Sequence, residues 1–284
     1  MSKKNGRKLP NKAQISTFTQ TVVSYWRSSG RHDLPWRDTE NPYKILVSEV
    51  MLQQTQVPRV LPKYESFLKK FPTQKSLSKA PLATVIKEWS GLGYNRRAKY
   101  LREAARAIQK DHHGVFPRTY EALRKLPGVG DYTAKAILVF AFDQPEFLIE
   151  TNIRTVLAHH FYASHTPKTK IKDSEFLELA ERVGKEMNPR EWHWALMDYG
   201  AHLKANGIRL NTKSAHYARQ SRFEGSLREV RGAILRSLGF SSTNEESLEA
   251  ELEFPRDRFL AALEGLFKDG LIEEKDGILR LALN

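Results

Sequence analysis

Apolar residues recur every three or four positions along most of the first 205 residues, which is the spacing of amphipathic helices. Proline, glycine and asparagine interrupt the pattern, so several helices of ordinary length are expected. No alternating run long enough for a strand occurs before residue 225. The pattern predicts helices over residues 16–26, 42–55, 60–71, 77–89, 96–109, 120–125, 152–161, 173–187 and 191–204.

The centre of this helical region is a glycine turn between two predicted helices. Residues 126–134 read Leu-Pro-Gly-Val-Gly-Asp-Tyr-Thr-Ala and lead into an apolar run over 137–142. Gly128 and Gly130 permit positive φ and carry no side chain, so their amides can point outward where the next helix begins. Such a turn can bind phosphate. A plain link between two packed helices is the alternative interpretation.

The pattern changes after residue 225. Helices are predicted over 227–238, 247–252 and 257–267, and two short strands, 271–274 and 278–281, flank a turn at 275–277. Three helices followed by a hairpin predict a small winged-helix-like α+β domain over 226–284. The chain is therefore divided into a basic flexible arm (1–12), a mainly α, two-lobed helical domain (13–225) and this C-terminal domain.

Charge favours a polyanionic partner. The 284 residues hold 46 Lys plus Arg and 33 Asp plus Glu, a net charge of +13, and nucleic acid is the leading candidate. Residues 226–284 hold eight basic and twelve acidic residues, which leaves 38 basic and 21 acidic residues before them. Residues 204–222 are basic without an acid and predict an extended phosphate-contacting segment or a solvated linker.

The residue types present in the chain exclude several kinds of chemistry. There is no cysteine, so disulfides, thiolate nucleophiles and cysteine-bound iron–sulfur clusters cannot form. The nine histidines show no ligand spacing, and no resident metal is expected. No apolar run is long enough for a membrane helix and no signal core opens the chain, so we expect an intracellular, cytoplasmic protein associated with the nucleoid.

Two carboxylates are candidates for acid chemistry. Glu49 lies on the apolar stripe of helix 42–55, where partial burial would favour a protonated carboxyl. Glu150 ends the apolar run 147–149 at the start of helix 152–161. One protonated and one ionised carboxylate can break a bond to an anomeric carbon. Each could instead be an ordinary helix glutamate, paired with a cation or placed at a helix N-terminus.

Four sequence blocks carry a family resemblance. They are Leu34-Pro35-Trp36-Arg37, residues 48–57 (Ser-Glu-Val-Met-Leu-Gln-Gln-Thr-Gln-Val), residues 89–94 (Trp-Ser-Gly-Leu-Gly-Tyr) and the glycine turn at 126–134. In this order and spacing the chain resembles helix-hairpin-helix (HhH-GPD) DNA glycosylases of the MutY adenine-specific type. The resemblance covers about residues 16–205 and implies a two-lobed helical fold that extrudes a base from duplex DNA.

The resemblance also implies roles for particular residues. Glu49 would protonate adenine and Glu150, followed by Asn152, would stabilise the sugar cation. Tyr132 stands where strand-cleaving relatives carry a lysine, so base removal without efficient strand cleavage is implied. The DNA contacts implied by the resemblance or by the basic segment are Leu52, Gln53, Gln54, Tyr94, Arg37, Gly128, Gly130, Lys204, Arg209 and Lys213. A monovalent or divalent cation at the hairpin is compatible with this pattern.

Three departures from the family pattern matter. Glu150 replaces an aspartate, which lengthens the stem by one methylene. Lys204 stands at the first of four cysteine positions that hold an iron–sulfur cluster in relatives, so the basic segment is expected to replace the cluster. The C-terminal domain is too short for the Nudix-like domain that reads 8-oxoguanine in MutY enzymes, which puts a preference for that base in doubt.

The preferred hypothesis is a monofunctional glycosylase that removes adenine opposite guanine or 8-oxoguanine in double-stranded DNA. A glycosylase for thymine or uracil in mispairs is one alternative. A DNA-damage-binding protein with weak or no catalysis is the other, because Glu150 departs from the family residue. We expect a monomer whose C-terminal domain could bind a protein partner.

Overall fold

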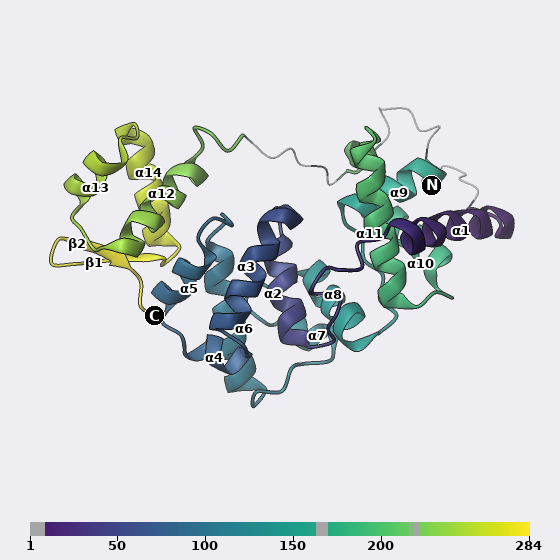
Figure 1. Ribbon diagram of the computed structural model, residues 1–284, viewed down its shortest axis with the longest axis horizontal. Coiled ribbons are helices and arrows are strands. Elements are labelled where there is room, and N and C mark those ends of the chain that lie inside the picture. The colour runs from purple at the N-terminus through teal and green to yellow at the C-terminus, as the bar shows by residue number, and fades with distance from the viewer. Residues whose placement is uncertain (1–8, 163–169, 216, 218–221) are drawn as a thin grey trace, which may run out of the picture. The chain divides into compact units, whose positions relative to one another are not determined.

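The computed structural model describes residues 9–162, 170–215, 217 and 222–284 (Figure 1). Within them the chain is mainly helical, with a single two-stranded sheet. Contacts divide it into two compact units, one made of residues 1–38 and 135–219 and the other of 39–134 and 220–284. The predicted mainly α fold with a small C-terminal α+β part is confirmed.

The first unit contains the helices near both ends of the helical region. Helices α9 and α11 form its closest pair, and a Cβ at Gly200 would lie 2.5 Å from the backbone oxygen of Asn152, so only glycine fits there. Phe18 of α1, Phe176 of α10 and Trp192 of α11 are buried in its core. Its elements are α1 (Lys12–Ser29), the later part of α8 (Asp131–Phe142), α9 (Thr151–Phe161), α10 (Asp173–Gly184), α11 (Pro189–Ala205) and the 3₁₀ turn η1 (Leu210–Lys213).

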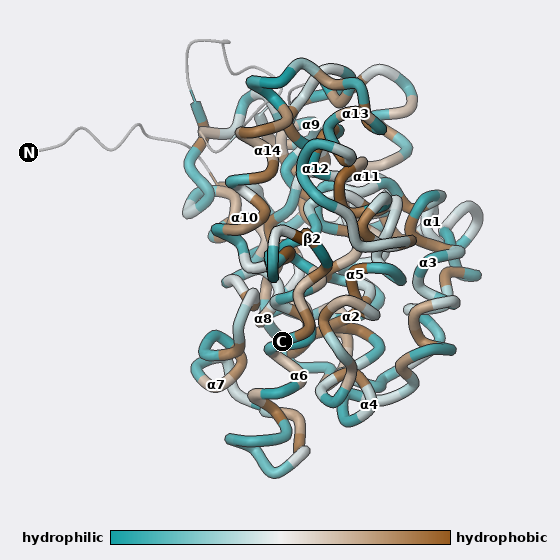
Figure 2. The backbone as a smooth tube through the Cα atoms, turned by 90° about the vertical axis from the view of Figure 1, so that its left-hand side faces the viewer, coloured by the Kyte–Doolittle hydropathy of each residue, from teal (hydrophilic) through white to brown (hydrophobic). Residues whose placement is uncertain are grey.

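The second unit contains the remaining helices of the helical region. Helix α2 is buried on nearly every side, from Tyr43 and Ile45 through Met51. Polar and apolar residues alternate with helical spacing along the more amphipathic helices, as the colouring of Figure 2 shows. The elements are α2 (Pro42–Leu52), α3 (Val57–Lys70), α4 (Gln74–Lys79), α5 (Leu82–Trp89), α6 (Arg96–Asp111), α7 (Tyr120–Arg124) and the start of α8.

The C-terminal helices and hairpin belong to this second unit. They are α12 (Leu227–Phe240), α13 (Glu245–Leu252), α14 (Arg256–Lys268), β1 (Ile272–Lys275) and β2 (Ile278–Leu281). The strands pair antiparallel with Ile272 opposite Leu281. An isolated antiparallel bridge pairs Thr243 with Leu279 of β2. Leu82 and Ile86 of α5 share one apolar core with α12 and α14. The boundary at residue 226 stays a prediction.

Several predicted boundaries were wrong. Residues 77–89 are not one helix, because Ala80 is extended before Pro81, which cannot continue the backbone hydrogen bonding. Helix α10 ends at Gly184 and α11 begins at Pro189 behind an Asn188 cap. The segment 204–222 is not extended throughout, since α11 runs to Ala205 and η1 follows.

Two predictions fall partly outside the described residues. Most of the basic arm, residues 1–8, lies outside them, and Lys12 already begins α1 behind the side-chain cap of Asn11. Residues 216 and 218–221 of the basic segment lie outside as well. In the part of the chain that is described, no helix is long and apolar enough to cross a bilayer.

Candidate active site and DNA interface

The glycine hairpin connects α7 to α8. Gly128 has φ +74°, and a Cβ there would lie 2.6 Å from the Cβ of Tyr100, so both conformation and space require glycine. Gly130 does not have positive φ, which corrects half of the prediction, but nothing lies within 4 Å of its missing Cβ. The space beside Gly130 leaves room for a ligand at the N-terminus of α8.

Glu49 lies in the middle of α2 and is 8 % exposed. Asn41 caps this helix by accepting the amides of Tyr43 and Lys44, and Pro42 occupies its first turn. The residues around Glu49 are apolar and buried from Ile45 to Met51, apart from Ser48. A carboxyl buried in the middle of a largely apolar helix is in the setting that a general acid requires.

Arg97 fixes the end of α2, and sequence reasoning missed it. Its guanidinium donates to the carbonyls of Val50 (2.7 Å), Met51 (3.0 Å) and Gln53 (2.6 Å). Further donors reach Thr55 Oγ1 and the carbonyls of the 91–94 turn. Burial lowers the pKa of Arg97 to about 10. The only feature of the sequence that points to Arg97 is its position three residues after Tyr94, which ends the 91–94 turn.

The predicted wedge residues lie beyond this helix end. Leu52 is the last residue of α2 and is half-buried. Gln53 donates from Nε2 to Thr133 Oγ1 (3.3 Å), which joins the end of α2 to the start of α8. Gln54 and Tyr94 are exposed and half-buried respectively, and both have positive φ, +56° and +46°. Both residues line the same two pockets, so these two strained positions lie on one surface of the second unit.

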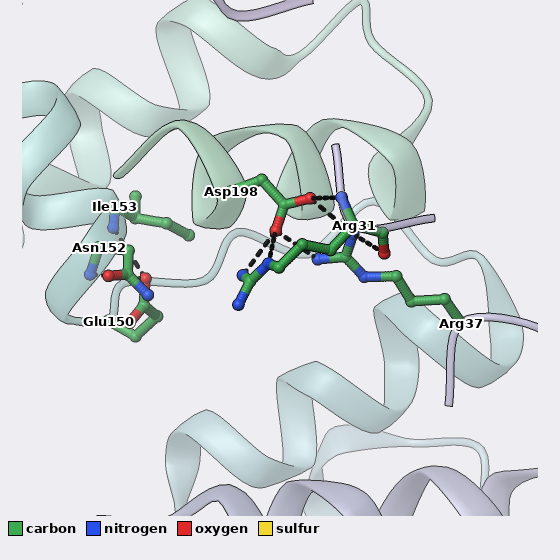
Figure 3. Close-up of polar contacts among 6 residues, drawn as sticks. All are labelled: Arg31, Arg37, Glu150, Asn152, Ile153 and Asp198. Carbon is green, nitrogen blue, oxygen red and sulfur yellow. Dashed lines mark hydrogen bonds and ion pairs between the residues drawn. The ribbon is translucent and has the colours of Figure 1, made fainter. Parts of the chain in front are cut away.

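Glu150 is the N-cap of α9 in the first unit (Figure 3). Its Oε1 accepts the amides of Asn152 (2.7 Å) and Ile153 (2.8 Å), and its Oε2 accepts the hydroxyl of Thr151 (3.1 Å). Backbone amides and the helix dipole both favour a negative charge here. The longer stem therefore still positions its carboxylate at the helix N-terminus, next to Asn152.

Lys204 lies beside this carboxylate rather than on an extended phosphate-binding segment. Its Nζ donates to Thr151 Oγ1 (2.9 Å) from the last turn of α11. Burial lowers the pKa of Lys204, and the charge of Glu150 partly offsets that effect. Lys213 is also engaged, donating to the carbonyl of Tyr162 (2.9 Å), whereas Arg209 is exposed before η1. The predicted DNA role thus fits Arg209 better than the two lysines.

Comparison with known proteins agrees with this arrangement. The profile of HhH-GPD superfamily base excision DNA repair proteins matches residues 47–182. An adenine DNA glycosylase of Mycobacterium tuberculosis is 36% identical over 280 residues, which cover 90% of each chain. The chain belongs to the HhH-GPD superfamily.

Other members of the superfamily match over a shorter stretch. An adenine DNA glycosylase of Buchnera aphidicola subsp. Baizongia pistaciae is 38% identical over 184 residues, 65% of this chain, and the match spans about half (52%) of that protein. A thermostable thymine-DNA glycosylase of known structure superimposes with a TM-score of 0.59 and 30% identity, covering 66% of this chain and 87% of its own.

In this HhH-GPD protein Arg37 is a buried anchor, and its predicted role as a DNA contact stays a prediction. Its guanidinium donates to both carboxylate oxygens of Asp198 (2.7 and 2.8 Å), and its side chain is 6% exposed. Arg31 binds the same carboxylate through its backbone and side chain (Figure 3). Burial raises the pKa of Asp198, but the hydrogen bonds and charges of Arg37 and Arg31 outweigh it, so that pKa lies below its ordinary value.

A second missed residue, His193, supports the segment that leads to Glu150. Its Nε2 accepts the amide of Leu148 (3.0 Å), and its Nδ1 donates to the carbonyl of Pro189 (2.6 Å). Burial lowers the pKa of His193 to about 4, and the bond to Pro189 opposes that shift only weakly. A neutral histidine therefore ties the residues before Glu150 to α11. Its place between two tryptophans was the available signal.

Proposed function

We propose that the protein is a DNA glycosylase that hydrolyses the N-glycosidic bond of adenine mispaired with guanine or 8-oxoguanine. The observation that carries the proposal is the match to the Mycobacterium tuberculosis adenine DNA glycosylase over nine-tenths of both chains. The buried Glu49 and the helix-capping Glu150 supply the two carboxylates that such a reaction needs.

In the proposed reaction Glu49 protonates adenine as the bond to C1′ breaks, and the bonding electrons leave with the base. The deoxyribose becomes a cation-like transition state, which the ionised Glu150 stabilises. Water then adds to C1′ and its proton restores the acid form of Glu49, so that adenine and an abasic site are the products. Asn152 follows Glu150 in the first turn of α9 and holds it through its backbone amide.

The proposed enzyme is monofunctional. Cleavage of the abasic strand by a protein amine requires a Schiff base with C1′, and position 132 at the hairpin is a tyrosine, whose phenol cannot form one. The proposal also includes a monomer that acts on chromosomal DNA inside the cell. A protein partner of the C-terminal helices stays a prediction.

Hairpin amides bind a DNA phosphate in this proposal. The open space at Gly130 and the N-terminus of α8 favour an anion there. The residues cannot hold the iron–sulfur cluster of relatives, because the chain has no cysteine and Lys204, in the last turn of α11, stands at the predicted first ligand position. A monovalent or divalent cation bound by the hairpin remains part of the proposal.

A second candidate function has a specific observation behind it. The thymine-DNA glycosylase of known structure shares 30% identity and superimposes over 66% of this chain. Thymine or uracil removal from mispairs would use the same two carboxylates. Damage binding without catalysis is the third candidate, and it requires that Glu150, held by two backbone amides, cannot serve the sugar.

One experiment separates these functions. Duplexes carrying adenine, thymine or uracil opposite guanine or 8-oxoguanine are incubated with the protein, and abasic sites are revealed by alkali. We expect breaks only in the adenine strands, none without alkali, and none with Glu49→Gln. Breaks only in thymine or uracil strands would support the second candidate. Tight binding without an abasic site in any duplex would support the third.

A further inference from the structure

A cleft of about 560 Å³ lies within the second unit, between the end of α2, the 91–94 turn and α12. Gln54 and Tyr94 line one wall, together with Arg59 of α3. Arg228 and Arg236 of α12 line the other. The cleft is large enough for a nucleotide, and it is built partly from the C-terminal helices.

Its charge is of one sign among the described residues. Arg59, Arg228 and Arg236 line the cleft and no carboxylate does, although residues 226–284 carry more acids than bases. Seven of the twelve acids of this part lie away from the cleft, four on α13 and three on the hairpin of β1 and β2. The basic residues of α12 are therefore concentrated where a polyanion could enter.

The cleft also offers surfaces on which bases stack. Arg228 donates to the hydroxyl of Tyr94 (2.8 Å) and lies 5.3 Å from the centre of its ring. Arg97 lies 5.5 Å from the same ring. Phe223 is 55% exposed at the edge of the cleft. Planar arginine side chains and an exposed aromatic ring in one basic groove are the combination that binds unpaired nucleotides.

The position of the cleft indicates which strand would enter it. Glu49 does not line it, so it does not receive the base that is excised. A second pocket, of about 440 Å³, shares Gln54, Tyr94 and Arg228 with the cleft and continues to Gly128 of the hairpin. The two pockets thus connect the hairpin, which would hold one strand of a duplex, to α12 within the same unit.

We propose that α12 forms one wall of a binding site for the DNA strand opposite the excised base, with Arg228 and Arg236 contacting that strand. The proposal rests on the proposed glycosylase function. Donor-only arginine side chains match the acceptor atoms O6 and N7 of guanine as well as phosphate oxygens. The C-terminal part thereby contributes to substrate binding.

The test measures binding to a duplex in which 2′-fluoro-2′-deoxyadenosine, which resists excision, faces guanine. Affinity is followed over a salt series, and each strand is footprinted with hydroxyl radicals. Arg236→Gln alters one wall and Arg59→Gln the other, and both residues are exposed. Lys275→Gln, an exposed charge on the hairpin outside the cleft, is the matched control. Thermal unfolding verifies that each variant is folded.

Each cleft variant is expected to weaken binding about fivefold, to reduce the salt slope by about 1 and to shorten protection of the guanine strand only. The control should match the wild type. Unchanged affinity and footprint in both variants would overturn the proposal. That result would instead favour a protein partner at α12. Excision by the wild type is measured separately on the same duplex with ordinary adenine: no excision there would reject the glycosylase function, while the footprint still decides on the cleft.

Discussion

Glu49 is buried in the middle of α2, a helix whose other residues from Ile45 to Met51 are mostly apolar, whereas Glu150 is held by backbone amides in the first turn of α9. The helix around Glu49 is fixed at its end by Arg97. The segment before Glu150 is fixed by His193, and its neighbour Thr151 by Lys204. The two units thus hold their carboxylates by different means, so equivalent substitutions should have different consequences.

The largest expected effect is on chemistry at Glu49. Glu49→Gln removes the proton donor and should lower the single-turnover rate of adenine excision about 10²- to 10⁴-fold. Glu150→Ala should lower the rate and also remove the cap of α9, which costs about 1 kcal/mol of unfolding free energy. Urea unfolding and excision rates are measured on both variants. Equal losses of unfolding free energy in Glu49→Gln and Glu150→Ala would contradict the claim that only Glu150 caps a helix.

Arg97 tests whether the second unit depends on one buried guanidinium. Arg97→Met leaves the carbonyls of Val50, Met51 and Gln53 without their donor and should cost about 3 kcal/mol of unfolding free energy. The neighbouring Arg96, exposed and paired once with Asp269, is the control. Arg96→Met should change stability by less than about 1 kcal/mol. Similar losses of unfolding free energy in the two variants would show that Arg97 does not stabilise the end of α2 in this way.

Low pH should reduce the unfolding free energy of the first unit, because His193 must then take up a proton. Its pKa in the folded protein is about 4, below the ordinary value of 6.5, so the unfolded chain binds a proton first as pH falls. Stability contributed by the neutral ring is therefore complete above pH 6.5 and is lost progressively toward pH 4. Between pH 7 and pH 5 the expected loss is about 2 kcal/mol. Asp198, whose pKa is lowered, loses its contribution only at lower pH.

Urea unfolding at pH 7, 6 and 5 measures this loss. His193→Gln keeps an acceptor near Leu148 but cannot titrate, so its stability should depend less on pH. Some dependence should remain, because burial also lowers the pKa of His160 to about 4 in the same unit. Hydrogen exchange should show earlier opening of α9 and α11 than of α2. The same pH slope in wild type and variant would exclude His193 as the cause.

Local patterns predicted much of this structure. Caps and prolines located most helices, and the glycine turn indicated the positive φ of Gly128. The carboxylates stood out because each interrupts or ends an apolar run. The partners of Arg37 and Lys204 lie far away in the sequence instead. Arg37 meets Asp198 across 161 positions and Lys204 meets Thr151 across 53, and no local pattern reports such pairs.

The smallest effect expected is that of Lys204 on Glu150. Lys204→Met removes the ammonium beside the carboxylate and its hydrogen bond to Thr151, so excision should slow about fivefold at pH 7. The effect should shrink at high pH, because burial lowers the pKa of Lys204 and the wild-type amine then loses its charge below the ordinary value of 10.5. Arg154, the other nearby cation, is already paired with Asp173 and should not compensate. Lys204→Arg, which keeps a positive charge at this position, should retain the excision rate of the wild type at pH 7. Lys213→Met, which removes an ammonium bound to a carbonyl, is the control. A pH-independent loss in Lys204→Met would mean that the lysine only supports the fold.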